Sequence, residues 1–351
     1  PHFTYDMIRI DVAQFGDIGQ TIYRPLDELS ISPEGLSPRL IKNGYDSYSM
    51  LNGRVYALPL DPSVQIFLYR TDLFHDAKLC RAYYERFHEN LVVPTTYEQY
   101  LHAAEFFTRS CNPDSPTEYG TTMTCGSASV AASDFLPFYL SRIDRFGSTP
   151  ETLRLDSPEM QAAMRQYHAL EKFSCKQNWW GDSIQKFAEG KTAMTVIYSN
   201  YAAELINSGN SVVVGRVGAA ILPGCKPLLG GGIVGISRYS QKAEACKQFF
   251  HWYYSADVAS LLVRLGGTSP IVDAYEDFQN YSIFPWMNTS KKSFGLGQRG
   301  VINQTPERFS IPKYEFAVGT AVRNVVQDLM TPEDASRMAQ ALYDAAEPVC
   351  R

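Results

Sequence analysis

The sequence predicts an α/β protein of two domains. Short apolar segments rich in β-branched and aromatic residues alternate with segments that carry helix-capping signals, which is typical of strands alternating with helices. The clearest apolar segment covers residues 64–69, and a helical segment follows it directly. The chain has 351 residues, which is enough for two domains of ordinary size.

Residues 52–74, NGRVYALPLDPSVQIFLYRTDLF, form the most informative stretch. An Asn-Gly turn signal opens it, and residues 54–60 and 64–69 follow as two predicted strands. A polar break from Asp61 to Ser63 separates these strands. Because α/β proteins present ligand-binding groups at strand ends, Asp61 and Ser63 are candidate binding residues.

Strand and helix signals also alternate before and after residues 52–74. Thr95 or Thr96 can cap a helix, with Glu98 or Gln99 closing a capping box, and Ser157 can cap another. Further strands are expected at residues 5–12, 119–123 and 191–197. Helices are expected at residues 13–19, 76–90, 95–110, 135–143, 157–173, 183–189, 242–263, 313–325 and 332–346.

Composition excludes several classes of protein. The net charge of −5 and the pI of about 5.8 argue against a nucleic-acid-binding surface. No apolar run approaches the roughly 20 residues that a membrane-spanning helix needs. The first residues show neither the basic nor the apolar region of a signal peptide, so we expect upstream residues to have been removed.

The seven cysteines are odd in number and irregular in spacing. No CxxC pair or Cys/His cluster is present, so the sequence predicts no zinc site and no other metal or cofactor site. Cys246 lies on an apolar helix face and is expected in the core. An odd count fits a reducing compartment better than an oxidising one.

Residues 229–237, LGGGIVGIS, resemble a phosphate-binding loop only superficially. The GxxxxGK[ST] pattern is absent, and the glycines precede a strand instead of opening a helix. Glycines here allow the backbone to approach a ligand closely, which makes Gly231 and Gly232 candidate binding residues.

Several segments, taken in order, resemble extracellular solute-binding proteins of the maltose-binding class. Residues 52–74 resemble that family's NGKxYGLPxD and LxYNxDLF segments, and residues 311–324 resemble its IPxxxxFxxAVRTA segment. The most specific match is FxxGKxAM, which residues 187–194 reproduce in register. The resemblance covers almost the whole chain.

The resemblance implies a two-lobed periplasmic-binding-protein-like fold of type II, each lobe a mostly parallel sheet flanked by helices. The first lobe is expected at residues 1–68 and 216–272, and the second at 69–215 and 273–351. Hinges are expected near 66–72 and 212–218. One upstream βαβα unit of the family pattern is missing, which would leave a sheet edge unpaired.

The resemblance also implies a ligand cleft between the lobes. Asp11 and Gln14 follow the first predicted strand, although Asp11 can equally be a helix N-cap. Asn200 can likewise cap a helix that begins at Tyr201. Trp180, in the pair Trp179-Trp180, suits stacking on sugar faces. The resemblance further implies that Tyr198, Ser199 and Asn200, which follow the FxxGKxAM motif, are ligand-binding residues.

The expected function is reversible binding of a sugar or oligosaccharide with delivery to the permease of an ABC importer. Such a chain would be an extracellular or cell-surface lipoprotein and a monomer. The cysteines leave open a cytoplasmic sugar-sensing domain joined to a helix-turn-helix regulator, which would be a dimer. A glycosidase using Asp11 and Asp61 is a further alternative, but nucleophile motifs such as GxSxG are absent, so no enzyme is expected.

Overall fold

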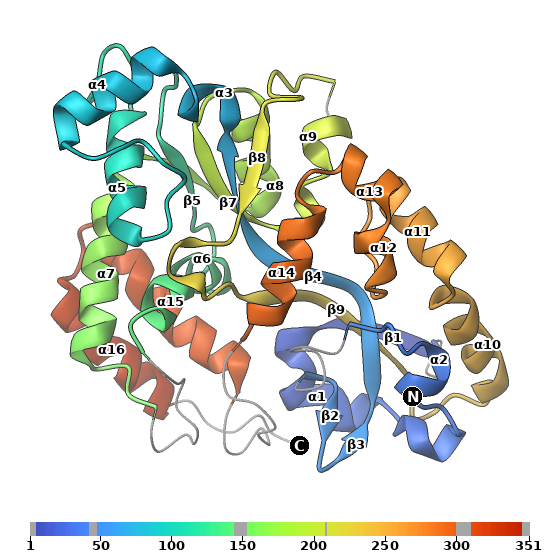
Figure 1. The fold of residues 1–351 in the computed structure, drawn as a ribbon. Coiled ribbons are helices and arrows are strands. Elements are labelled where there is room, and N and C mark those ends of the chain that lie inside the picture. The colour runs from blue at the N-terminus through green and yellow to red at the C-terminus, as the bar shows by residue number, and fades with distance from the viewer. Residues whose placement is uncertain (1–4, 42–47, 144–152, 208, 300–309, 346–351) are drawn as a thin grey trace.

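The computed structural model describes residues 5–41, 48–143, 153–207, 209–299 and 310–345. Two groups of helices and strands lie on either side of a central sheet, and long strands of that sheet run from one group to the other (Figure 1). The chain therefore has two lobes, as the sequence predicts. The strands of the central sheet are β1 (Met7–Asp11), β4 (Ala57–Arg70), β7 (Met194–Tyr198), β8 (Val217–Ala220) and β9 (Leu229–Ile236).

Strand β4 is the centre of this sheet. Its first half pairs with β9, and its second half pairs with both β7 and β8. Strand β1 pairs with β9 at the edge of the sheet. Val64, Ile66, Phe67 and Leu68 of β4 are completely buried. β-Branched and aromatic residues favour such a buried, pleated surface, which explains why this segment forms the core strand.

The prediction of two strands separated by a polar break is wrong, because β4 is one strand of 14 residues. Its register with β9 shifts between Pro59 and Asp61, where a bulge accommodates the extra residue. Gly231 lies beside this bulge with φ of 87°, and a β-carbon there would lie 2.2 Å from the carbonyl oxygen of Asp61. The polar residues thus lie in a bulged strand instead of a loop.

The first lobe surrounds β1 and β9. It also carries the hairpin of β2 (Met50–Leu51) and β3 (Arg54–Val55). Its helices, seen in blue and orange in Figure 1, are α1 (Phe15–Ile22), α2 (Pro33–Leu36), α10 (Ala243–Tyr253), α11 (Ala256–Arg264), α12 (Asp273–Glu276), α13 (Phe278–Ile283) and α14 (Met287–Leu296).

The second lobe surrounds β7 and β8 and holds the pair β5 (Thr121–Thr124) and β6 (Ser174–Gln177). Its helices are α3 (Thr71–Phe74), α4 (Ala77–Phe87), α5 (Tyr97–Phe106), α6 (Ala128–Leu140), α7 (Pro158–Glu171), α8 (Trp180–Ala188), α9 (Glu204–Asn207), α15 (Ile311–Val326) and α16 (Pro332–Ala345).

The pairing of β4 shows where the chain passes between the lobes. Val64 pairs with β9 of the first lobe, whereas the next residue, Gln65, pairs with β7 of the second. The chain returns between β8 and β9. This arrangement differs from the expected boundaries, because β8 lies with the second lobe and α12–α14 lie beside α11 in the first (Figure 1). The hinge positions stay a prediction.

The expectation of mostly parallel sheets is wrong for the described strands. All pairs in the central sheet are antiparallel, and only β5 and β6 form a parallel pair between named strands. The antiparallel pairing follows from the way in which the chain crosses between the lobes. The chain passes outward along β4 and comes back along β8 and β9, so outgoing and returning strands lie side by side in opposite directions.

The capping predictions for α5 and α7 are confirmed. Thr96 and Gln99 form the capping box of α5, and the Ser157 hydroxyl accepts a hydrogen bond from the Met160 amide at the start of α7. Cys246 is buried in the core, as expected. In contrast, residues 125–133 were not expected to be helical, but α6 begins at Ala128 because Ser127 caps it and α15 packs against its first turns.

The long helix expected at residues 242–263 is two helices. Tyr254 and Ser255 separate α10 from α11, and Ser255 has an extended conformation that ends the helical run. The buried Tyr254 hydroxyl donates to the carbonyl oxygen of Pro59, which fixes the break against β4. Apolar residues keep their helical spacing through the break, so the sequence pattern gave no sign that the helix is interrupted.

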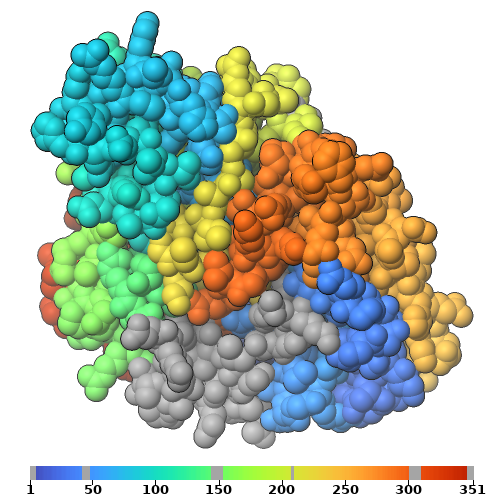
Figure 2. All heavy atoms as spheres, viewed as in Figure 1, coloured from blue at the N-terminus to red at the C-terminus, as the bar shows by residue number. Residues whose placement is uncertain are grey.

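Helix α14 covers the region where the strands cross. Thr289 donates a hydrogen bond to the carbonyl oxygen of Ala219 in β8, so a helix of the first lobe contacts a strand of the second. Figure 2 shows the orange atoms of α14 lying directly against the yellow atoms of β8. This contact spans the lobes on the face of the molecule shown there.

Candidate functional site

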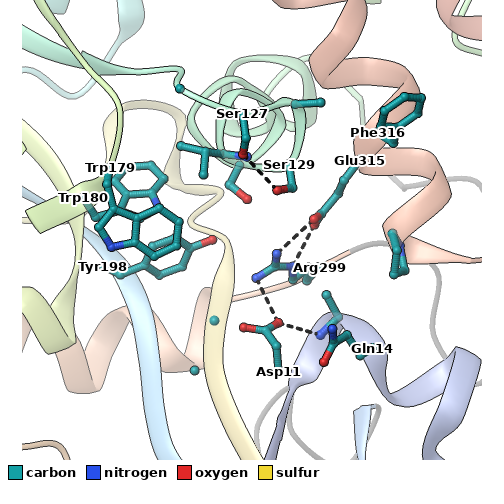
Figure 3. A pocket seen from close by; sticks show the side chains of 18 of the residues that line it. Asp11, Gln14, Ser127, Ser129, Trp179, Trp180, Tyr198, Arg299, Glu315 and Phe316 are labelled. Atoms are coloured by element: carbon teal, nitrogen blue, oxygen red, sulfur yellow. Dashed lines mark hydrogen bonds and ion pairs between the residues drawn. The ribbon is translucent and has the colours of Figure 1, made fainter.

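A cavity of about 1040 Å³ lies between the lobes. The first lobe lines it with the end of β1, the turn after it, and the bulged part of the β4–β9 pair. The second lobe lines it with the start of α6, the loop before α8, the end of β7 and one face of α15 (Figure 3). Predicted binding residues that line the cavity are Asp11, Gln14, Asp61, Trp180, Tyr198, Asn200 and Gly231.

Asp11 has both of the roles that the sequence left open. Its carboxylate accepts a hydrogen bond of 2.9 Å from the Ala13 amide and so caps the 3₁₀ turn Val12–Gln14. It also faces the cavity, where it lies 3.8 Å from a guanidinium nitrogen of Arg299. The cap fixes the direction in which this carboxylate points.

Asp61 forms an ion pair with Arg9. The two guanidinium–carboxylate distances are 3.2 Å and 2.7 Å, and both side chains are partly exposed to the cavity. Gly232 lies beneath this pair, and it does not line the cavity. Arg9 was not among the predicted binding residues, although its position two residues before Asp11 in a strand places both side chains on one face of the sheet.

Arg299 and Glu315 form a buried ion pair at the base of the cavity. The distances are 2.8 Å and 3.0 Å, and Arg299 also donates to the carbonyl oxygen of Leu229 in β9. Burial raises the pKa of Glu315, and the facing Arg299 opposes that shift. Neither residue was predicted from the sequence. Arg299 lies in residues 278–301, which show no clear helical or strand period, and Glu315 is one of several charged residues in its helix.

The two adjacent tryptophans have different environments. Trp180 is only 3% exposed and packs edge-on against the Tyr198 ring, with centroids 5.1 Å apart. Trp179 is 50% exposed and reaches into the cavity near Tyr201. Trp179 therefore offers the freer aromatic face, whereas the sequence singled out Trp180. Trp286 and Phe294, from the aromatic-rich segment 278–301, are buried and serve packing.

Three predicted binding residues lie behind the cavity wall. Ser63 donates a hydrogen bond of 2.6 Å to the side-chain oxygen of Asn200, and the Ser199 hydroxyl accepts one from the Val64 amide. Asn200 lies within the 3₁₀ turn Ser199–Tyr201, so the prediction that it caps a helix is wrong. Ser63, Ser199 and Gly232 thus position their neighbours and do not line the cavity.

The described residues contain no cluster of three or more His, Cys, Asp or Glu side chains arranged to hold a metal ion. Within the described ranges, every helix is too short or too polar to cross a bilayer.

A sequence model of the bacterial extracellular solute-binding protein family matches residues 6–286. The chain belongs to this family. Its members bind solutes and are not enzymes, which confirms the expectation of a binding protein. The family is extracellular, so this solute-binding protein is assigned outside the cytoplasm or at the cell surface.

Solved structures share the fold over nearly the whole chain. An ABC transporter solute-binding protein from Agrobacterium radiobacter K84, in complex with ribitol, has a TM-score of 0.78 and 21% identity, covering 96% of this chain and 84% of that one. Maltose-bound MalE3 of T. maritima has a TM-score of 0.75 and 20% identity, covering 98% and 85%. A protein from Agrobacterium vitis S4 with bound D-mannitol has a TM-score of 0.73 and 19% identity, covering 97% and 84%. The predicted two-lobed type II fold is confirmed.

Proposed function

We propose that this solute-binding protein holds a sugar or polyol in the interlobe cavity and delivers it to an ABC importer. The observation that carries the proposal is the cavity itself, which combines an exposed aromatic face with fixed polar groups from both lobes. Proteins of the same fold were solved with ribitol, mannitol and maltose. Apolar faces with a few aimed polar groups suit the C–H faces and hydroxyls of such ligands.

Ligand release and capture then depend on movement of the lobes. Strand β4 and the connection from β8 to β9 link the two lobes covalently, so a hinge motion would take place in these segments. Closure would bring Asp11, Gln14 and Asp61 of the first lobe toward Trp179 and Tyr198 of the second. We expect the closed form to be the one that the permease recognises.

The site argues against hydrolysis. A glycosidase needs one carboxyl group free to protonate the leaving group and one free to act as nucleophile or base. Asp61 is held by Arg9 through two contacts, and Asp11 accepts from the Ala13 amide. Both carboxylates are therefore engaged in charge pairing and capping, which suits orientation of a ligand and not proton transfer.

The proposal also covers membrane anchoring and oligomeric state. We expect a monomer tethered as a lipoprotein. The second candidate, a cytoplasmic sensor domain, runs against the extracellular family assignment and is favoured by one observation: the six cysteines among the described residues are all free thiols. The upstream sequence of the gene separates the two, since a lipobox cysteine supports the first and a basic helix-turn-helix supports the second.

A thermal-shift screen against monosaccharides, polyols and oligosaccharides tests the proposal. A ligand that binds only the native state raises the melting temperature by mass action. We expect at least one saccharide or polyol to raise it, and Asp61→Ala or Tyr198→Ala to weaken the shift. A flat response to the whole panel would exclude this ligand class.

A further inference from the structure

The second lobe presents an arginine to the cavity that lacks the pairing of the other two. Arg323 lines the cavity, and its Nε atom is buried with no hydrogen-bond partner among the described residues. Arg9 and Arg299 instead pair with Asp61 and Glu315. A buried donor left without an acceptor destabilises the fold, so an acceptor on the ligand is its natural partner.

Helix α15 holds Arg323 against the first turn of α6. Gly319 permits this close packing, because a β-carbon there would lie 1.7 Å from the carbonyl oxygen of Ala128. Phe316, Thr320 and Arg323 recur at helical spacing, so all three project from the same face of α15 into the cavity. The packing therefore places a guanidinium beside the start of α6.

The start of α6 adds further donors. Ser127 and Ser129 lie side by side at the cavity, with their hydroxyl oxygens 3.3 Å apart (Figure 3). Ser127 accepts from the Val130 amide, but the first amide groups of a helix have no partner within it. Helix α6 has 13 residues, and the positive end of its dipole points at this part of the cavity.

Tyr198 supplies an independent sign that a ligand group belongs here. It is 6% exposed and lines the cavity, and its buried hydroxyl has the Ser133 side chain beside it but makes no hydrogen bond of normal geometry to any described residue. Figure 3 shows this hydroxyl directed toward the side of the cavity where Ser127 and Arg299 lie. Burial raises the pKa of Tyr198 to about 12, so the hydroxyl keeps its proton and can donate it.

Each of the three carboxylates that line the cavity already has a partner within the chain. Asp61 is paired with Arg9, Glu315 with Arg299, and Asp11 lies near Arg299 while capping its turn. The second-lobe wall therefore combines a guanidinium, hydroxyls and free amides with no unpaired carboxylate beside them. Guanidinium groups bind planar carboxylate and phosphate groups through paired, charge-assisted hydrogen bonds.

We propose that this wall, defined by Ser127, Ser129, Tyr198, Thr320 and Arg323, binds an acidic group on the sugar. The group is a carboxylate, a phosphate ester or a sulfate ester. This inference rests on the proposed sugar-binding function and narrows it, from neutral sugars to acidic ones.

Isothermal titration calorimetry on the full chain tests the proposal with matched ligands. Glucose is compared with glucuronate, glucose 6-phosphate and glucose 6-sulfate, and cellobiose with cellobiouronate. Inorganic phosphate and sulfate reveal whether a free ion suffices. We expect at least one acidic sugar to bind about tenfold or more tighter than its neutral counterpart, which is about 1.4 kcal/mol. Arg323→Gln should abolish the difference, and Arg323→Lys should keep part of it.

Arg81→Gln is the matched control, because Arg81 lies on α4 with 82% of its side chain exposed and does not line the cavity. The proposal is overturned if neutral sugars bind as tightly as acidic ones, if no acidic sugar binds, or if the preference survives Arg323→Gln. Neutral-sugar binding with no preference for the acidic counterpart keeps the proposed function while removing this inference. Binding of no sugar at all removes both.

A measurement on the unmodified chain covers the case in which Arg323→Gln does not fold. Affinity for the acidic sugar should fall several-fold as ionic strength rises from about 0.05 M to about 0.5 M, whereas affinity for a neutral sugar should not change. Equal salt dependence for both ligands would contradict the proposal.

Discussion

The guanidinium of Arg9 and the carboxylate of Asp61 meet across strand β9, over Gly232. Arg9 lies on β1 and Asp61 on β4, and β9 runs between these two strands. A β-carbon at Gly232 would lie 2.1 Å from Nε of Arg9 and 2.4 Å from Oδ1 of Asp61. The glycine therefore leaves space for an ion pair that fixes Asp61 at the floor of the cavity.

Gly232→Ala tests this relationship. The added methyl group must push the two side chains apart, so we expect ligand affinity to fall about tenfold, a change of about 1.4 kcal/mol. The pair is partly exposed, so its loss should lower the free energy of unfolding by at most about 1 kcal/mol. Calorimetry with the best saccharide and urea denaturation measure the two effects.

Gly209→Ala is the control for this substitution, since a β-carbon at Gly209 would meet no atom within 4 Å. It should leave affinity and stability unchanged. Unaltered binding in Gly232→Ala would mean that the orientation of Asp61 does not matter to the ligand.

Several strands and most caps could be predicted from sequence because their causes are local. The apolar residues of β4 and the Thr96–Gln99 box act within a few positions of the chain. The same local logic pointed to Asp61, although its polar break proved to be a bulge within β4, whereas Asp11 came from the family resemblance. The bulge in β4 escaped prediction, because it depends on the register with β9.

Pairing over long distances could not be predicted from residue types. Arg9 finds Asp61 only because β1 and β4 share β9 as a neighbour. Likewise, Gly232 was expected to let a ligand approach, whereas it makes room for two side chains. One sequence contains no signal for either contact, since each depends on which strands become neighbours.

The unequal burial of the two tryptophans leads to a second prediction. Trp179→Ala should weaken sugar binding about tenfold and change the unfolding free energy by less than about 1 kcal/mol, because half of this side chain is exposed. Trp180→Ala should instead cost about 3–5 kcal/mol of stability, as for other large buried aromatic residues. Titration of ligand and of urea, followed by fluorescence, separates the two effects. Equal losses of stability would show that Trp179 is also a packing residue.

The buried pair of Arg299 and Glu315 gives a third prediction. Glu315→Leu leaves the Arg299 guanidinium buried without its partner, so we expect a loss of about 3–5 kcal/mol in the free energy of unfolding. Glu315→Gln keeps an acceptor and should cost less. Urea denaturation measures both.

Glu85→Ala is the comparison for Glu315→Leu, because Glu85 pairs with Arg81 on the exposed surface of α4. Such a pair contributes about 0.3–0.5 kcal/mol. If Glu315→Leu cost no more than Glu85→Ala, the pair would not be an anchor of the cavity floor.

Asp134 gives the fourth prediction, which concerns pH. Burial raises the pKa of this carboxyl group from 3.8 to about 7, while hydrogen bonds from Tyr167 and from the Thr124 amide oppose the shift. Between about pH 4 and pH 7 the folded chain therefore holds a proton that the unfolded chain has released. Stability contributed by this group is complete below about pH 4 and is lost as the pH rises through about 7.

Asp134→Asn should remove this dependence. Both hydrogen bonds end on Oδ2 of Asp134, and the amide oxygen of asparagine can accept both. We expect the variant to match the wild-type chain near pH 4 and to exceed it at pH 8 by up to about 4 kcal/mol, the free energy of three pKa units. Asp114→Asn, on an exposed loop residue, should leave the pH profile unchanged. Urea denaturation from pH 4 to pH 8 measures the profiles, and a variant that loses stability in parallel with the wild-type chain would show that Asp134 stays ionised in the fold.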